Sequence, residues 1–118
     1  MSEKHQNVTV LIADIVGFTE ISSNTSPKEI VSLLNELFSS FDYLCTLYGV
    51  EKVKTIGDAY VAVAGIGNEP SHAESVVDLA LEMQSAPVLT RNCLGYKLRL
   101  RIGVASGPVL SGVRLPKN

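Results

Sequence analysis

The pattern of apolar and polar positions divides the chain into short extended segments and two longer amphipathic segments. Residues 8–13 are a run of β-branched and aliphatic side chains, long enough for a strand buried on both faces and too short for a buried helix. Residues 18–22 predict a short helical turn. Residues 27–48 carry apolar side chains at spacings of three, four and seven, which predicts a helix with one buried face. That face consists of Ile30, Leu33, Leu34, Leu37, Phe38, Phe41, Leu44, Cys45 and Tyr48.

Both ends of this long helix carry the residues that usually mark helix termini. Ser26 is suited to the N-cap, Pro27 to the first helical position, and Glu29, three residues after the cap, to closing a capping box. Gly49 is suited to the left-handed conformation that ends a helix. The boundaries of this helix are therefore predicted more sharply than those of the other elements.

Two further extended segments, residues 50–56 and 59–64, are joined by Gly57 and Asp58. A two-residue connection with glycine first is typical of a type II′ turn, so the two strands are expected to be antiparallel neighbours. A second helix is predicted over residues 71–85. The residues predicted to face the core from this helix are Val76, Val77, Ala80, Leu81 and Met83.

Basic and aliphatic residues alternate over residues 97–105, as they do in a strand with one buried face. The aliphatic side consists of Leu98, Leu100 and Ile102, and the basic side of Lys97, Arg99 and Arg101. Residues 106–108, with the sequence Ser-Gly-Pro, predict a turn. Residues 109–113 are expected to begin another short element.

The predicted order of elements, β-α-β-β-α-β, favours an α+β fold of the ferredoxin-like, split-βαβ type, with helices on one face of an antiparallel sheet. The chain of 118 residues is long enough for one such domain with one core. In this arrangement the first strand lies in the centre, beside the hairpin strand that follows the first helix. Asp14 ends the first strand and Asp58 lies at the hairpin tip, so both are expected at the same end of the sheet.

Two carboxylates beside a glycine-led turn are the kind of group that holds a divalent metal ion. Mg²⁺ prefers one or two carboxylates together with phosphate oxygens and water, and the outward-pointing amides of a turn that starts a helix bind phosphate. A chain with a net charge of −2 needs such local features to hold an anionic ligand. The alternative is that Asp14 caps a helix and Asp58 fills a turn, which are common uses of aspartate.

Composition narrows the classes of protein to which the chain could belong. Apolar residues make up 46% and charged residues 19%, which argues against a disordered chain, and the net charge of −2 leaves no basic surface for nucleic acid. The two cysteines, Cys45 and Cys93, stand apart from each other and from any histidine cluster, so no zinc site or disulfide framework is expected.

The N-terminus is polar, so we expect no signal peptide, and no apolar run approaches the roughly 18 residues that span a bilayer. We therefore expect no membrane contact from this segment. The expected location is the cytoplasm, either free or as the cytosolic part of a larger membrane-associated protein.

Three segments in order resemble the catalytic domain of the class III adenylate and guanylate cyclases. They are VLIADIVGFT at residues 10–19, VEKVKTIGDAY at residues 50–60 and LRIGVASGPV at residues 100–109. The likeness continues through LNELFSSFD and HAESVVDLALEM, so it covers nearly the whole chain. The order and register of several motifs make this resemblance specific, and it implies the fold predicted above.

The resemblance implies metal-binding or phosphate-binding roles for seven residues. Asp14 and Asp58 match the aspartates that bind two Mg²⁺ or Mn²⁺ ions, and Ile15 matches the position whose backbone carbonyl ligates one ion. The other implied contacts are Gly17, Phe18 and Thr19, in the turn whose amides hold the β- and γ-phosphates, and Arg101, which contacts phosphate. An exposed strand face is the alternative explanation of Arg101.

The implied reaction converts ATP to cyclic AMP and pyrophosphate by attack of the ribose 3′-hydroxyl on the α-phosphorus. Lys54 matches a residue that contacts the purine edge, and an ammonium group can only donate, which suits the N1 acceptor of adenine rather than guanine. The alternatives are a guanylate cyclase, which acts on GTP, and a non-catalytic dimerisation or regulatory module. Without the resemblance, Lys54 would be read as a surface lysine.

The resemblance ends with the chain, before the family's further segments that bind the base and stabilise the transition state. We therefore expect residues 1–118 to be a single cyclase domain that lacks the family's C-terminal part and is inactive alone. Family active sites form between two domains. A second cyclase domain, in a homodimer or a pseudodimer, is accordingly the expected partner.

Overall fold

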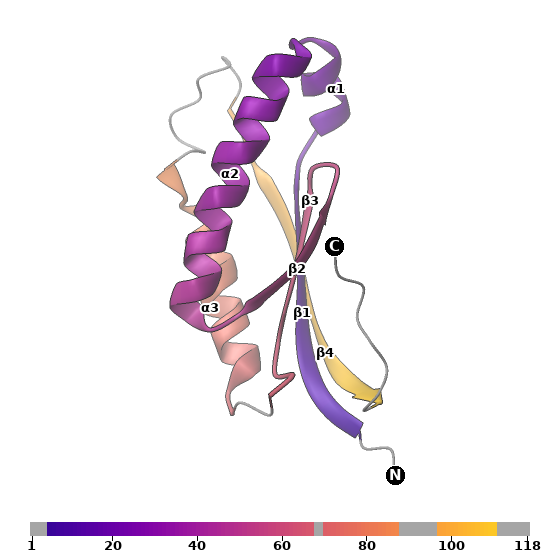
Figure 1. Ribbon diagram of the computed structural model, residues 1–118, viewed down its shortest axis with the longest axis vertical. Coiled ribbons are helices and arrows are strands. Elements are labelled where there is room, and N and C mark those ends of the chain that lie inside the picture. The colour runs from indigo at the N-terminus through magenta and orange to yellow at the C-terminus, as the bar shows by residue number, and fades with distance from the viewer. Residues whose placement is uncertain (1–4, 68–69, 88–96, 111–118) are drawn as a thin grey trace.

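A computed structural model describes residues 5–67, 70–87 and 97–110 of the chain (Figure 1). The strands are β1 (His5–Ile15), β2 (Glu51–Ile56), β3 (Ala59–Ala64) and β4 (Leu100–Leu110). The helices are α1 (Phe18–Ser23), α2 (Pro27–Tyr48) and α3 (His72–Gln84). The order of elements is the predicted β-α-β-β-α-β order, and the short α1 lies where a helical turn was predicted over residues 18–22.

The four strands form one antiparallel sheet in the order β2-β3-β1-β4, which confirms the predicted α+β, ferredoxin-like arrangement. The predicted neighbour of the first strand was wrong. β1 pairs with β3, the second strand of the hairpin, and β2 lies at the edge. The reason is burial, because β3 is largely buried while β2 is mostly exposed or half-buried. The more apolar hairpin strand takes the central position.

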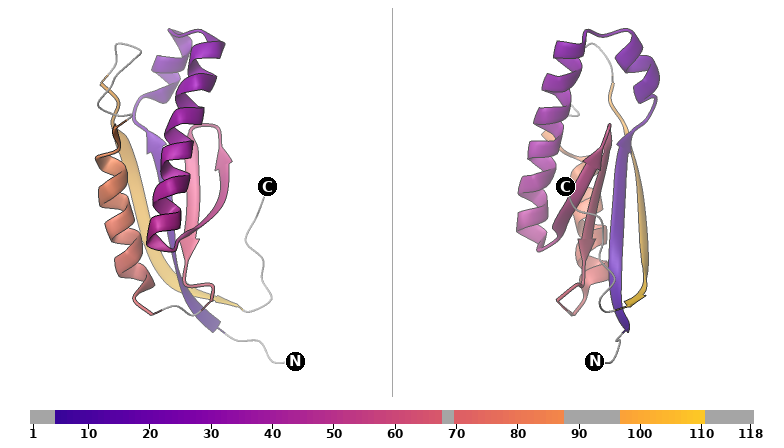
Figure 2. Two further views of the ribbon diagram at one scale, coloured as in Figure 1. Left: turned by 60° about the vertical axis from the view of Figure 1, so that its left-hand side comes forward. Right: turned by 45° about the vertical axis from the view of Figure 1, so that its right-hand side comes forward.

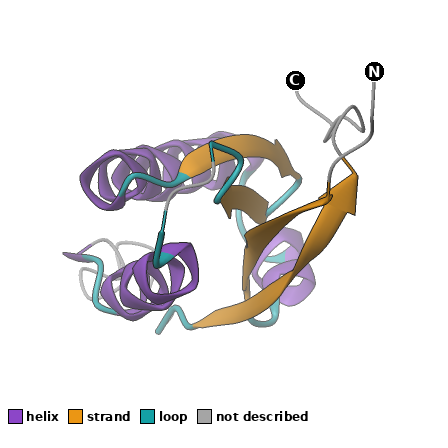
Figure 3. Ribbon diagram, turned by 90° about the horizontal axis from the view of Figure 1, so that it is seen from below, coloured by secondary structure: helices purple, strands orange, loops and turns teal. Residues whose placement is uncertain are grey.

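The two long helices, α2 and α3, lie on the same face of the sheet, and Figures 2 and 3 show no helix of similar length on the other face of the described structure. The core lies between these helices and the sheet. Its largest fully buried side chains are Tyr60, Phe41, Leu11, Leu37, Leu79, Met83, Val63, Val76 and Thr9. The short helix α1 lies beyond one end of the sheet, at the top of Figure 1, together with the turn between β2 and β3.

The boundaries and buried face of α2 are those predicted. Ser26 is the N-cap, its hydroxyl accepts a hydrogen bond of 3.2 Å from the Glu29 N–H, and Gly49 ends the helix with φ +69°. The Glu29 carboxylate differs from the predicted capping box, because it accepts a hydrogen bond of 2.9 Å from the Ser26 hydroxyl. Leu33, Leu37, Phe41 and Cys45 are buried, and the other five predicted residues pack partly buried against them.

Two of the residues assigned to the core from the second helix are exposed. Val76 and Met83 are buried as predicted, and Ala80 packs against the core, but Val77 is 47% exposed and Leu81 is 64% exposed. Leu79 takes the remaining buried position. The buried stripe follows the helical spacing of residues 76, 79, 80 and 83. Val77 and Leu81 each come one residue after a member of this stripe, so they lie on the outer face of the helix.

The last strand is longer than predicted, and residues 106–108 do not form a turn. β4 begins at Leu100 and continues to Leu110, with Pro108 opposite Asn7. The Val16 N–H donates to the carbonyl of Arg99, so these two opposed residues form a hydrogen-bonded pair. Hydrogen-bonded and non-hydrogen-bonded pairs alternate along an antiparallel ladder. Counted from Val16–Arg99, the Asn7–Pro108 pair is a non-hydrogen-bonded one. The missing N–H of Pro108 therefore faces away from β1, and the strand tolerates it.

The element predicted for residues 109–113 is also corrected, since its first two residues belong to β4 and residues 111–113 lie outside the described structure. Cys93 lies outside it as well. In the described part of the chain, no helix combines the length and apolar character that crossing a bilayer requires.

Candidate functional site

Asp14 and Asp58 come together at the end of the sheet that carries α1. Asp58 follows Gly57 in the turn between β2 and β3, where Gly57 has φ +59°. Ser71 is the only described non-glycine residue with a positive φ, so Asp58 has a negative one, and the pair has the signs of the predicted type II′ turn. The hairpin therefore delivers the Asp58 carboxylate to the end of β1.

A hydrogen bond between a side chain and the backbone joins the two strand ends. The N–H of Ile15, the residue after Asp14, donates to Asp58 Oδ2 at 3.0 Å. The last backbone pair of the β1–β3 ladder is Ala13 with Tyr60, and two residues further along Ile15 lies opposite Asp58. The Asp58 side chain thus takes the place of the next backbone acceptor. The side chain of Asp58 and the backbone of Ile15 are held beside each other.

Arg101 lies directly opposite Asp14 on β4. Its Nη2 donates to Asp14 Oδ2 at 3.2 Å, and its Nε lies 3.2 Å from Asp14 Oδ1. The side chain of Asp14 is 27% exposed and that of Arg101 is 72% exposed. One guanidinium group therefore neutralises the carboxylate from its solvent side.

The structure leaves one oxygen of Asp14 without a hydrogen bond. Among the described residues, Asp14 Oδ1 is the only buried side-chain nitrogen or oxygen with no hydrogen-bond partner, since the nearby Arg101 Nε approaches outside hydrogen-bonding geometry. A buried carboxylate oxygen that lacks a hydrogen bond is the kind of atom that a metal ion satisfies. The described residues contain no cluster of three or more His, Cys, Asp or Glu side chains. The possible metal ligands at this end of the sheet are two carboxylates and backbone carbonyls, and such oxygen ligands suit Mg²⁺ or Mn²⁺.

The predicted phosphate-binding turn also lies at this end of the sheet. Gly17 has φ +71° and is the N-cap of α1, which starts at Phe18 and continues through Thr19. The Ile21 N–H donates back to the Gly17 carbonyl at 3.1 Å, so the amides between them are the ones that the helix does not use. The turn begins at Gly17, three residues after Asp14, which keeps these amides near the carboxylates.

Lys54 lies on the face of the sheet away from α2 and α3. Lys54 is paired with Val61 on β3, and Val61 is paired with Ile12 on β1, so the three side chains share one face. Asp14 lies two residues after Ile12 and therefore on the same face of β1. Two strand spacings of about 5 Å each separate β2 from β1. Lys54 therefore shares a face with Asp14 and Arg101 without touching them.

A β-bulge at Val53 separates the two lysines of β2, and the pattern of the sequence did not predict it. Lys52 is opposite Ala62 and Lys54 is opposite Val61, so Val53 is the extra residue. In a regular strand, side chains two residues apart lie on the same face, which would put Lys52 and Lys54 on one face. Instead, Lys52 lies on the helix face, where its Nζ is 3.5 Å from Asp42 Oδ1.

Tyr60 anchors the hairpin to α2 and was also missed as part of the site's support. Its side chain is fully buried, and its hydroxyl donates to Asp42 Oδ1 at 2.6 Å. Lys52 Nζ lies 5.6 Å from the centre of its ring. A buried tyrosine hydroxyl requires a polar partner, and this requirement was the signal that could have linked Tyr60 to a residue of α2.

Burial, the hydrogen bond to Asp42 and the neighbouring Cys45 raise the pKa of Tyr60 well above its usual value of 10.0. In the unfolded chain the phenol titrates near that value, so the stability that the neutral phenol contributes is complete below pH 10 and is lost as the pH rises further. Between pH 10 and 11 the wild type should lose about 1 kcal/mol more unfolding free energy than Tyr60→Phe. Urea unfolding of both proteins at the two pH values measures this difference, and parallel losses would contradict it.

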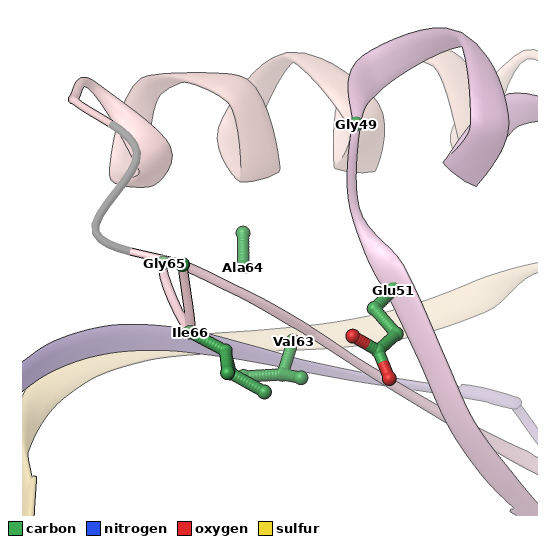
Figure 4. A pocket seen from close by; sticks show the side chains of 7 residues that line it. Gly49, Glu51, Val63, Ala64, Gly65 and Ile66 are labelled. Atoms are coloured by element: carbon green, nitrogen blue, oxygen red, sulfur yellow. The ribbon is translucent and has the colours of Figure 1, made fainter.

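A separate hollow of about 320 Å³ lies at the other end of β3, beside the start of β2 (Figure 4). Its lining residues are Gly49, Glu51, Val63, Ala64, Gly65, Ile66 and Gly67. Glu51 is the one charged residue among them, so this hollow does not suit an anionic ligand. The functional candidates gather at the opposite end of the sheet.

Comparison with known proteins matches this arrangement to one family. Residues 1–117 match the family model of the adenylate and guanylate cyclase catalytic domain. An adenylate cyclase of Mycobacterium tuberculosis (strain ATCC 25618 / H37Rv) is 40% identical over 114 residues, which are 96% of this chain and 26% of that protein. This chain thus spans about a quarter of the length of that curated relative.

Two solved structures resemble the fold closely. The catalytic core of a rhodopsin-guanylyl cyclase with converted specificity, in complex with ATPαS, has a TM-score of 0.81 and 40% identity over 95% of this chain and 64% of its own. The non-canonical dimeric guanylyl cyclase domain of the RhoGC fusion protein from the aquatic fungus Blastocladiella emersonii has a TM-score of 0.82 and 37% identity over 98% of this chain and 67% of its own. The chain belongs to the family of adenylate and guanylate cyclase catalytic domains.

Proposed function

We propose that this chain is the metal- and nucleotide-binding part of a nucleotide cyclase that converts ATP to cyclic AMP and pyrophosphate. The observation that carries the proposal is the meeting of Asp14, Ile15 and Asp58 at one end of the sheet, joined by the hydrogen bond from the Ile15 N–H to Asp58 Oδ2. The buried Oδ1 of Asp14 has no hydrogen bond and lies 3.2 Å from the exposed Arg101 guanidinium, which adds a reason for a metal ion to bind there.

The carboxylates of Asp14 and Asp58, with the backbone carbonyl of Ile15, would hold two Mg²⁺ or Mn²⁺ ions. Bound there, such ions acidify the ribose 3′-hydroxyl and neutralise charge on the phosphates. The protein holds its ligands in place through the Ile15–Asp58 hydrogen bond and through Tyr60, which ties β3 to α2.

The triphosphate is expected to lie over the turn formed by Gly17, Phe18 and Thr19. Amides at the start of a helix donate hydrogen bonds to phosphate oxygens without any conformational change. Arg101, whose guanidinium is largely exposed, is near enough to Asp14 to reach a phosphate bound beside it. Its planar fork suits two phosphate oxygens and stabilises the charge that builds up on the departing pyrophosphate.

Lys54 supports ATP as the purine nucleotide. Its ammonium group can donate to adenine N1 but cannot accept from the N1 and N2 hydrogens of guanine. It lies across β3 from Asp14 on the same face, a separation that suits a nucleotide with its phosphates at Asp14 and its base at Lys54. GTP is the second candidate, because the similar structures include guanylyl cyclase domains.

The proposed unit is a single cyclase domain, comprising residues 1–118, that works with a second cyclase domain. The dimeric form of one similar guanylyl cyclase domain supports pairing. The face of the sheet opposite α2 and α3, which carries Lys54, Asp14 and Arg101, is the face on which a second domain would complete the site.

Calorimetric titration with a non-hydrolysable ATP analogue, with and without Mn²⁺, tests the proposed function. We expect binding that requires Mn²⁺, is stronger than binding of the matching GTP analogue, and falls at least about tenfold in Asp58→Asn. The asparagine oxygen can still accept the Ile15 hydrogen bond, so this variant removes the charge and keeps the link between the strands.

Three other results of this titration would change the proposed function. Tighter binding of the GTP analogue would replace ATP by GTP as substrate. Binding that ignores both Mn²⁺ and the loss of the Asp58 charge would reject the metal site. A folded chain that binds neither nucleotide would favour the non-catalytic module.

A further inference from the structure

Arg101 and the metal ions of the proposed function need the same atoms of Asp14. The guanidinium donates to Oδ2 at 3.2 Å through Nη2 and approaches Oδ1 to 3.2 Å through Nε. Both carboxylate oxygens therefore face one resident cation. Asp58, by contrast, uses Oδ2 to accept from a backbone N–H and takes part in none of the described ion pairs.

The two partners of this ion pair differ in freedom. Asp14 is held in β1 opposite Arg101 by the register of the sheet and is 27% exposed. The Arg101 side chain is 72% exposed, so it can leave Asp14 for another anion without disturbing the core. An ion pair with one exposed partner is weak, and a competing ligand can break it.

We propose that Arg101 acts as an internal counter-ion that blocks Asp14 until a triphosphate draws the guanidinium away. This inference rests on the proposed function and adds a regulation of the same site. In the absence of nucleotide, Arg101 competes with a divalent ion for Asp14. When the nucleotide is present, its phosphates offer Arg101 a stronger partner, and the Asp14 oxygens become available. Metal and nucleotide binding are thereby coupled through one side chain, and the coupling is reciprocal.

The proposal predicts effects of opposite sign from a single substitution. Arg101→Met keeps an unbranched side chain and removes the charge, so Mn²⁺ added alone should bind about threefold to tenfold more tightly. The same variant loses a phosphate contact, so the non-hydrolysable ATP analogue should bind more weakly at saturating Mn²⁺. The factor by which the analogue tightens Mn²⁺ binding should therefore fall in Arg101→Met.

Arg99→Met is the matched control. Arg99 lies two residues before Arg101 on the exposed side of the same segment, opposite Val16, and none of its described contacts is with Asp14. Its substitution changes the net charge of the chain by the same amount and should leave Mn²⁺ binding unchanged. Arg101→Gln is a second neutral variant, and circular dichroism and thermal unfolding verify that each variant is folded.

Free Mn²⁺, counted by electron paramagnetic resonance during titration with MnCl₂, gives the affinity without any need for turnover. Tighter binding of Mn²⁺ alone in both Arg101 variants, with no change in Arg99→Met, is the expected result. If the wild type binds Mn²⁺ with the ATP analogue but the Arg101 variants bind Mn²⁺ alone no more tightly, the inference is wrong and the proposed function stands. If no variant binds Mn²⁺ under any condition, both fail.

Discussion

Asp14→Ala is expected to abolish cyclic AMP production by this chain when a second cyclase domain completes the site. The substitution removes a carboxylate that the proposed function assigns to the metal site, and it leaves Arg101 without its anion. Loss of groups that merely orient a metal ligand costs about 10-fold to 100-fold, so loss of a ligand itself should cost at least about 100-fold. This is the largest effect on activity that we expect from a single side chain.

The assay supplies a complete cyclase domain in trans, with alanine in place of its own two metal-binding aspartates, so that metal ligands come only from this chain. The wild-type chain should restore cyclic AMP formation, and Asp14→Ala should not. Lys28→Ala, at an exposed position in the first turn of α2, is a control expected to retain activity. Equal activity of the wild type and Asp14→Ala would instead support the non-catalytic, regulatory role.

Phe41→Ala is expected to produce the largest loss of stability. Phe41 is 1% exposed in the layer between α2 and the sheet, and its ring meets that of Tyr60 edge-on, with centroids 5.3 Å apart and an interplanar angle of 80°. Truncation leaves a cavity and removes the aromatic contact, for a cost of about 3 to 5 kcal/mol. Domains of this size are typically stable by about 5 to 15 kcal/mol, so this loss is a large share of the total unfolding free energy.

Tyr43→Ala tests whether burial, rather than aromatic character, carries this effect. Tyr43 lies on the same helix but is 65% exposed, so its replacement should change the unfolding free energy by no more than about 0.5 kcal/mol. Urea unfolding followed by circular dichroism compares the two variants with the wild type. Similar losses in both would show that the described core does not hold α2 to the sheet.

Elements whose pattern is complete within a few residues were predicted well. The apolar stripe of α2, its Ser26 cap and its Gly49 end depend on local geometry, and the structure has the same helix over Pro27–Tyr48. The glycine-first turn between β2 and β3 was predicted for the same reason. The meeting of Asp14 and Asp58 followed from the order of elements, even though the neighbour expected for β1 was the wrong hairpin strand.

Features that depend on which strands pair, and in which register, were not predicted. The sequence predicts a turn that includes Pro108, yet the position of this residue opposite Asn7 allows β4 to continue. The bulge at Val53 could not be predicted from the alternating pattern, because Lys52 and Lys54 are two residues apart, as residues on one face of a regular strand are. The partner of Tyr60 on α2 is 18 residues away in the chain and carries no local signal.

The sequence by itself determined the α+β class, the long helix, the hairpin and the two aspartates that strand ends bring together, because capping, turn chemistry and apolar spacing act between near neighbours. Only the tertiary structure decided that β3 rather than β2 lies beside β1, that Lys52 and Lys54 part to opposite faces, and that Arg101 lies against Asp14. Those outcomes follow from burial and from strand register, which are set by the sum of many contacts between residues far apart in the chain.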